Sequence, residues 1–252
     1  MSTGLGLTNQ HVQRLRRLIG RRSSRIEENA LVIDGPVLVA EAVAAGLEFE
    51  AQFLAPDAPP VPGAGTVHRL ADGVLEKVAD TESPNGIVAI ARRRSSSSDV
   101  LATASFVVVA DGVADPGNLG TIMRSAEAAG ADALVITAGT VDPTNPKCVR
   151  ASAGSLFRLP MVEVESIAAI GSGLVIVGTS SHEGVDMWSF DFTRRVAIVV
   201  GREAHGMSSD SPVDEWVSIP QTGRTESLNV AMAATVLCFE VARQRRGRNG
   251  TV

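Results

Sequence analysis

The chain has 252 residues, of which 44% are hydrophobic and 4% aromatic, and its formal net charge is −5. The absence of tyrosine argues against modules that stack bases on aromatic platforms, and the net charge leaves any nucleic-acid binding to local patches. The two cysteines have no zinc or disulfide spacing, the N-terminus has no signal-peptide pattern, and no apolar run suits a membrane span, so we expect a cytoplasmic protein.

The first part of the chain predicts a small α/β domain over residues 1–91. A helix is expected over residues 9–25. Residues 31–45 are then expected to form a strand, a Gly-Pro break and a second helix that ends at Ala45. Residues 49–54 and 86–91 predict two more strands.

Six arginines lie within twelve residues of the first predicted helix: Arg14, Arg16, Arg17, Arg21, Arg22 and Arg25. Two interpretations remain open, a solvated helix face, because Glu27 and Glu28 follow at once, and contact with RNA phosphates.

A domain boundary is predicted at residues 92–99, where three arginines precede a run of serines without apolar periodicity. Beyond it, continuous apolar runs at residues 106–110, 133–137, 174–178 and 196–200 alternate with segments of helix length. Strands that are apolar on both faces indicate a mainly parallel sheet covered on both sides. No G-x-G-x-x-G sequence follows any of these strands, which argues against a nucleotide-dependent oxidoreductase.

Three windows in this second part carry polar residues where strands end and helices begin. Asn118 and Arg124 lie early in the helix that follows residues 106–110, and Gly201 and Glu203 follow residues 196–200. The third window is the loop at residues 219–226, where Pro and Gly exclude regular structure.

Ser227 is predicted to cap the helix that starts at Leu228, and free amides at a helix start can hold a polar or anionic ligand. The alternative for the three windows is that these side chains only cap helices or face water.

Together these windows resemble the SpoU/TrmH family of RNA ribose 2′-O-methyltransferases, which belongs to the SPOUT superfamily. Asn118 with Arg124 matches the family's first motif, Gly-Arg-Glu-Ala-His-Gly at residues 201–206 the second, and residues 219–229 the third, in the family's order. The segment at residues 32–39 is similar to the small ribosomal-protein-like RNA-binding module found ahead of many members.

The resemblance implies a C-terminal trefoil knot on the α/β fold, S-adenosylmethionine as cofactor without a metal, and a homodimer formed through the catalytic domain. It implies a catalytic set of Asn118, Arg124, Glu203, Ser227 and Asn229, and a cofactor site at Gly178, Thr179, Ser180, Gly201, Ile219 and Leu228. Arg150 joins the arginines of the first helix as a residue expected to contact RNA.

The predicted activity is therefore transfer of a methyl group to an RNA ribose 2′-hydroxyl, in ribosomal RNA, with transfer RNA as the alternative. A non-catalytic RNA-binding or ribosome-assembly protein of the same fold is the alternative from another class. For Arg124, which is protonated at all ordinary pH values, an electrostatic clamp is physically easier than a base.

Overall fold

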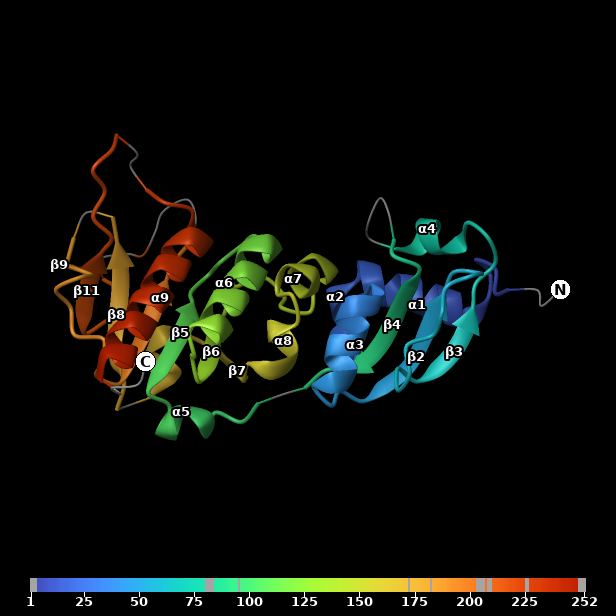
Figure 1. Ribbon diagram of the computed structural model, residues 1–252, viewed down its shortest axis with the longest axis horizontal. Coiled ribbons are helices and arrows are strands. Elements are labelled where there is room, and N and C mark those ends of the chain that lie inside the picture. Colours follow the sequence, from blue (N-terminus) through green and yellow to red (C-terminus); the bar gives the residue numbers. More distant parts are fainter. Residues whose placement is uncertain are drawn as a thin grey trace. The chain divides into compact units, whose positions relative to one another are not determined.

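The computed structural model describes residues 4–79, 84–94, 96–171, 173–181, 183–202, 207, 210–224 and 227–248. The chain forms two compact units, residues 1–94 with 142–157, and residues 95–141 with 158–252 (Figure 1). The predicted boundary at residues 92–99 assigned residues 142–157 to the second unit, whereas in the structure they belong to the first.

The first unit is built on a four-stranded sheet with the order β1-β4-β2-β3. The strands are β1 (Ala30–Asp34), β2 (Phe49–Leu54), β3 (Thr66–Arg69) and β4 (Ile87–Arg92). β4 pairs antiparallel with β1 and β2, whereas β3 pairs parallel with β2. The structure confirms the three predicted strands, and β3 is an additional strand.

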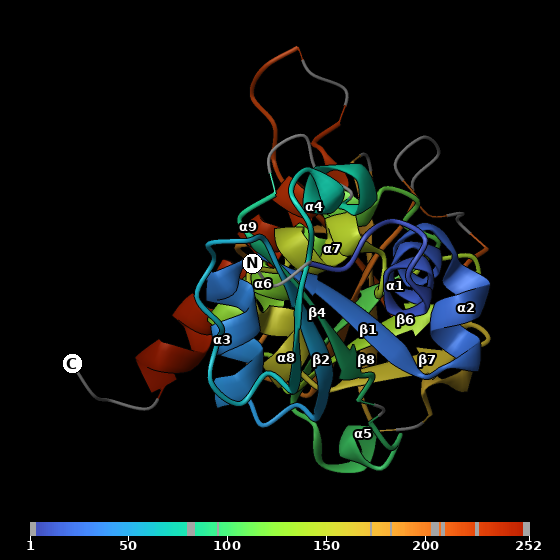
Figure 2. The same cartoon turned by 90° about the vertical axis from the view of Figure 1, so that its right-hand side faces the viewer.

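Helices cover both faces of this sheet (Figure 2). On one face, α1 (Gln10–Gly20) and α4 (Val74–Val78) bury Leu15 and Leu75 against the strands. On the other, α3 (Pro36–Ala44) packs together with residues of α7 (Pro146–Ala151) and α8 (Ser155–Arg158), whose Val149 and Phe157 are buried. Residues 142–157 thus complete the core of the first unit.

The helix predicted over residues 9–25 is in fact two helices, α1 and α2 (Arg22–Glu27). Arg21 separates them with an extended backbone, φ −127° and ψ 117°. This break changes the direction of the chain, so Arg25 on α2 donates to the carbonyl groups at the end of α1.

The second unit contains a seven-stranded sheet in which all six neighbouring pairs are parallel, with the order β7-β6-β5-β10-β8-β11-β9. The strands are β5 (Phe106–Ala110), β6 (Ala133–Thr137), β7 (Met161–Val164), β8 (Val175–Ser180), β9 (Val185–Asp186), β10 (Val196–Val200) and β11 (Glu215–Ser218). The predicted parallel sheet is confirmed, and because every strand runs the same way, all carboxyl ends lie at one edge.

Each face of this sheet is covered as predicted. The buried cluster on one face includes Leu101 of α5 (Val100–Thr103) and Ile170 of the 3-10 helix Ile167–Ile170. The other face is covered by α6 (Pro116–Ala128) and α9 (Val230–Arg248), which pack against each other (Figure 1). Among the described helices, none has the length and apolar character that crossing a bilayer requires.

Candidate active site

Three strand ends meet at the centre of the carboxyl edge of the second unit. Gly178, Thr179 and Ser180 are the last residues of β8, which lies between β10 and β11. Gly201 directly follows β10, and Ile219 directly follows β11. The sheet therefore brings together the five predicted cofactor residues that follow or end strands.

Gly178 has a packing role that sequence reasoning missed. The Trp216 side chain lies so close to it that an added Cβ at Gly178 would come within 2.8 Å of the indole. A Cβ at Gly184 would come within 2.4 Å of the Trp216 carbonyl oxygen. Glycine is required at residue 178 because the indole of Trp216 lies against it, and at residue 184 because the backbone of Trp216 does.

The loop from β5 into α6 is fixed by side-chain hydrogen bonds. Asp115 caps α6 by accepting from the amide of Asn118 at 2.9 Å, and Pro116 occupies the first helical position. Thr137 donates to Asp111 at 2.7 Å, which ties this loop to the end of β6. Asn118 is thus held in the first turn of α6 at the carboxyl edge.

The first and third motifs meet at the starts of two helices. The side-chain amide of Asn229 donates to Oδ1 of Asn118 at 3.1 Å. Asn229 Oδ1 also accepts from the amides of Ala231 and Met232, at 2.9 and 3.3 Å, so Asn229 caps α9. The prediction that Ser227 is the cap is wrong, since α9 begins two residues later than expected and Asn229 occupies the capping position.

A second contact fixes the relative direction of α6 and α9. Ser125 Oγ lies 2.7 Å from Thr235 Oγ1, about two turns beyond the pair of asparagines on each helix. The helices are therefore parallel, and both begin at the carboxyl edge. Arg124, next to Ser125, is exposed and has no hydrogen-bond or ion-pair partner among the described residues.

Arg202 is a cation of this edge that sequence reasoning missed. A Cβ at Gly112 would lie 2.6 Å from Arg202 Nε, so the arginine passes directly over the loop that leads to α6. Gly112 has φ +68°, a conformation that favours glycine, and the glycine after Asp111 was the available signal in the sequence. The predicted residue Glu203, like Thr225 and Glu226 of the third motif, lies outside the described residues.

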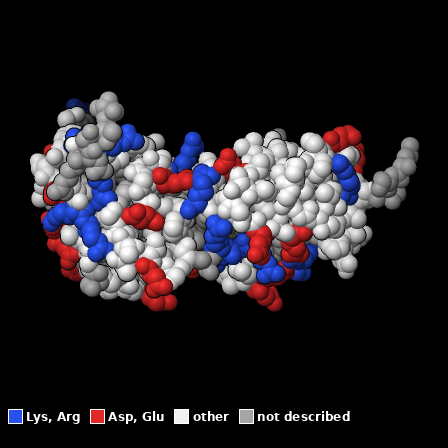
Figure 3. All heavy atoms as spheres, turned by 60° about the horizontal axis from the view of Figure 1, so that its bottom comes forward, with Lys and Arg blue, Asp and Glu red and all other residues white. Residues whose placement is uncertain are grey.

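In the first unit, carboxylates bind part of the basic run. Arg14 pairs with Glu28 at 2.6 Å and with Glu50, and Arg17 pairs with Glu28 at 2.7 Å. Burial favours the neutral form of Glu28, but hydrogen bonds from Arg17 and Arg14 outweigh it and lower its pKa. Figure 3 correspondingly shows basic and acidic side chains interspersed on the visible surface.

Of the remaining four arginines of the run, three are exposed and one, Arg25, is buried. Three of them have exposed side chains without a partner among the described residues: Arg16, Arg21 and Arg22. These three remain candidates for contact with phosphate.

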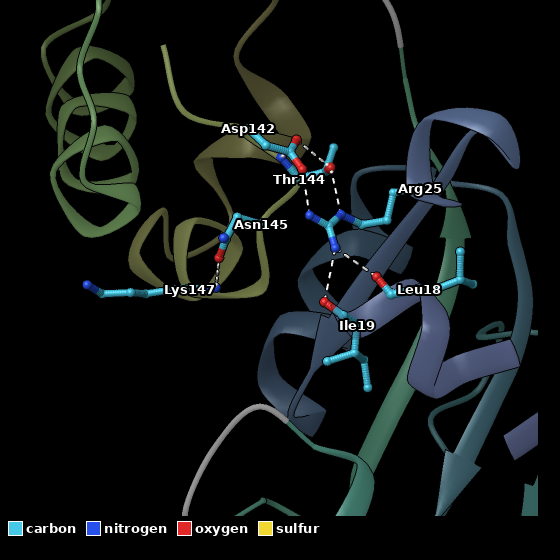
Figure 4. Close-up of polar contacts among 7 residues, drawn as sticks. All are labelled: Leu18, Ile19, Arg25, Asp142, Thr144, Asn145 and Lys147. Atoms are coloured by element: carbon cyan, nitrogen blue, oxygen red, sulfur yellow. Dashed lines mark hydrogen bonds and ion pairs between the residues drawn. The ribbon is translucent and has the colours of Figure 1, made fainter. Parts of the chain in front are cut away.

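Arg25 is buried, with 4% exposure, and the prediction that it binds RNA is corrected. Its guanidinium donates to the carbonyls of Leu18 and Ile19, to Thr144 Oγ1 at 3.1 Å and to Asp142 Oδ2 at 2.6 Å (Figure 4). Burial favours the neutral form of Asp142, yet hydrogen bonds from Thr144 and Arg25 lower its pKa. Arg25 therefore holds residues 142–144 to the first unit.

Arg150, the other predicted RNA contact, extends from α7 toward Asp34, with 3.9 Å between Nη1 and Oδ2. Its side chain is 31% exposed, so part of it remains accessible. Within the described part of the chain, no group of three or more His, Cys, Asp or Glu residues is arranged to hold a metal ion.

Two family models match the chain in the order of the two units. The SpoU rRNA Methylase family matches residues 105–239, and the MRM3-like substrate binding domain matches residues 9–89. The first match contains all three motifs, and the second contains the basic run.

Relatives and solved structures cover most of the chain. A 23S rRNA (guanosine(2553)-2′-O)-methyltransferase of Bacillus subtilis is 32% identical over 246 residues, 92% of this chain and 96% of the relative. A 23S rRNA (uridine(2479)-2′-O)-methyltransferase of Streptomyces viridochromogenes is 37% identical over 195 residues, 71% of this chain and 68% of the relative. The crystal structure of the SpoU methyltransferase AviRb from Streptomyces viridochromogenes with AdoMet superimposes with a TM-score of 0.85 at 31% identity, covering 94% of this chain and 98% of that one.

Proposed function

The chain belongs to the SpoU rRNA Methylase family, and we propose that it methylates the 2′-hydroxyl of a ribose in ribosomal RNA with S-adenosylmethionine as the methyl donor. The observation that carries the proposal is the contact between Asn118 and Asn229. It joins two motifs, 111 positions apart in sequence, where two parallel helices start beside the strand ends. A protein that only bound RNA has no need for this arrangement.

The strand ends suit the cofactor. Gly178, Thr179, Ser180, Gly201 and Ile219 present backbone groups at one edge of the sheet, and Leu228, 38% exposed, precedes α9. The bound cofactor supplies a methyl group on a positively charged sulfur. The protein's task is to align this methyl group with the ribose oxygen and to exclude water.

In the transfer, the methyl carbon would pass from the cofactor's sulfur, which would be left as a neutral thioether, to the ribose 2′-oxygen, and the hydroxyl proton would go to water. Negative charge develops on that oxygen, so a nearby cation lowers the barrier. We assign this role to Arg124, which also clamps the adjacent phosphate. Asn118 and Asn229 orient the ribose through neutral hydrogen bonds, and Ser227 and Glu203 complete the proposed catalytic set.

Arg124→Ala tests this assignment. Loss of a preorganised charge lowers the methyl-transfer rate on the order of 100- to 1000-fold. Cofactor affinity, measured by calorimetry without RNA or metal, stays unchanged. Arg246→Ala, which removes an exposed arginine near the far end of α9, is the matched control. Wild-type turnover by Arg124→Ala contradicts the assignment.

Arg124→Lys separates a clamp from a base. Lysine keeps the charge, loses the planar fork and gives up a proton more readily. A clamp predicts poor activity at every pH, whereas a base predicts activity that recovers as pH rises.

The RNA target is proposed from the relatives, which are named 23S rRNA methyltransferases, and from the match to a substrate binding domain. A ribosomal substrate also favours a cytoplasmic location, where ribosomes assemble. Mapping of ribose methylation in 23S rRNA and tRNA, from cells with and without the protein, tests the target. A missing methyl group in tRNA alone would select the tRNA alternative.

We further propose a homodimer formed through α9. Three apolar side chains of α9 follow one another at helical spacing and are 39–64% exposed: Met232, Val236 and Phe239. An apolar stripe of this length is typical of an interface. Met232→Lys with Phe239→Lys is expected to halve the molar mass measured by light scattering. Ile26→Lys, which changes an exposed apolar residue of the first unit, should leave it unchanged.

The C-terminal trefoil knot is also part of the proposal. It is supported by the chain path, because β11 follows β10 in sequence yet pairs with β8, and α9 then returns to α6. Mechanical extension from both ends tests it, since a knotted chain stops short of the roughly 3.3–3.6 Å per residue of an open chain.

A further inference from the structure

Trp188 is a large aromatic side chain left in water beside the proposed site. It is 61% exposed, in a chain that has two tryptophans and no tyrosine. Trp216, the other indole, packs against Gly178. An exposed indole offers a large, flat apolar face on which a ligand or partner can pack.

The position of Trp188 is set by the sheet. β9 pairs parallel with β11, with Ser218 opposite Asp186, and the Met187 amide donates to the Ser218 carbonyl at 3.0 Å. Trp188 therefore follows the last paired residue, at the carboxyl edge that carries the cofactor residues. Two strand spacings, about 10 Å, separate β9 from β8.

The turn around Trp188 is anchored on both sides. The Trp188 amide donates to Asp186 Oδ1 at 2.8 Å, and the Ser189 amide donates to the Asp186 carbonyl at 2.9 Å. Met187 and Phe190 are buried, with 4% and 5% exposure. The indole is thus presented from a fixed turn, which reduces the conformational entropy that a ligand must offset.

We propose that Trp188 stacks on an unpaired nucleobase of the RNA substrate, at the edge of the site where ribose is methylated. The inference rests on the proposed function. RNA that presents a ribose at the end of β8 passes close to β9, and every base offers a face on which an indole stacks. One such stack is worth about 1–3 kcal/mol, and it positions the RNA without reading its sequence.

Tryptophan fluorescence tests the stack directly, with an in vitro transcript of 23S rRNA as probe. In the wild-type protein, saturating RNA should quench the emission of Trp188. Trp188→Phe retains only Trp216, and its emission should not respond. S-adenosylmethionine alone should not quench Trp188, which separates an RNA base from the adenine of the cofactor.

Affinity supplies the second measurement. Trp188→Ala is expected to weaken binding of the transcript about 5- to 150-fold, with Trp188→Phe intermediate and cofactor affinity unchanged. Unchanged wild-type emission with RNA demonstrably bound on filters overturns the inference and leaves the proposed function intact. A molar mass of the Trp188→Ala variant that is half that of the wild type also overturns the inference, because such a result would place the indole at an interface between two copies of the chain. A wild-type protein that neither binds nor methylates the transcript rejects the proposed function and the inference with it.

Discussion

Substitution of Asn229 separates its two roles, helix cap and partner of Asn118. Asn229→Ala removes the acceptor for two amides of the first turn of α9, which costs about 1 kcal/mol. It also removes the exposed bond to Asn118, worth at most about 1 kcal/mol more. The sum of about 1–2 kcal/mol is expected to lower the midpoint of thermal unfolding by about 2–8 °C.

Asn229→Asp keeps the cap, because Asp and Asn are equally good capping residues and a negative charge suits a helix start. Its unfolding midpoint should therefore stay close to that of the wild type. The carboxylate cannot donate, however, so Asn118 must turn its amide nitrogen toward residue 229 and direct its carbonyl away. We expect the rate of methyl transfer at saturating RNA to fall about 100-fold, as for misplacement of a substrate.

Thermal unfolding and transfer of a radioactive methyl group are measured on both variants. Wild-type transfer by Asn229→Asp would refute the reasoning, since it would make Asn229 a cap only. Equal destabilisation by both substitutions would refute the cap. A double-mutant cycle with Asn118→Ala isolates the bond between the two asparagines, for which we expect a coupling of about 0.5–1 kcal/mol.

Two further predictions concern the first unit. Replacing Arg16, Arg21 and Arg22 with Gln should weaken RNA binding. The slope of log affinity against log salt concentration should fall by roughly 0.7–0.9 for each phosphate that is no longer neutralised, and filter binding that shows an unchanged slope would identify a solvated face. Arg14→Gln should have a smaller effect, because two carboxylates already bind Arg14. The pKa of Asp142 is lower in the fold than in the unfolded chain, so its stabilising contribution is present above the unfolded value of about 3.9 and disappears as pH falls through the folded value; acid unfolding followed by circular dichroism should show this decrease, and Asp142→Asn should remove it.

Sequence patterns predicted the parts of the fold that burial dictates. Strands β5, β6 and β10 have the predicted bounds because each is an almost continuous apolar run. β2 also has the predicted bounds, although Glu50 and Gln52 interrupt its apolar residues. β3 and β9 were not predicted, since they are short strands at sheet edges with mostly exposed or half-buried residues. Such strands owe their existence to their neighbours and have no clear periodicity of their own.

The site shows the same division. The resemblance to the SpoU/TrmH family predicted that Asn118 and Asn229 act together, and the structure brings them into contact. Sequence alone could not choose between Ser227 and Asn229 as cap, because both residue types are preferred there. It also could not predict that Arg25 pairs with a residue 117 positions away, because its neighbours in sequence are those of a solvated helix.

The assignment of residues 142–157 to the first unit has a consequence for recombination and protein engineering. The chain passes between the units three times, at residues 94–95, 141–142 and 157–158. A gene fragment starting at residue 100 would encode Val149 and Phe157 without the strands that bury them, and Asp142 without Arg25. Grafting another substrate-recognition domain onto this enzyme therefore requires exchange of two segments, residues 1–94 and 142–157. A simple N-terminal fusion would retain residues 142–157 without the core against which they pack.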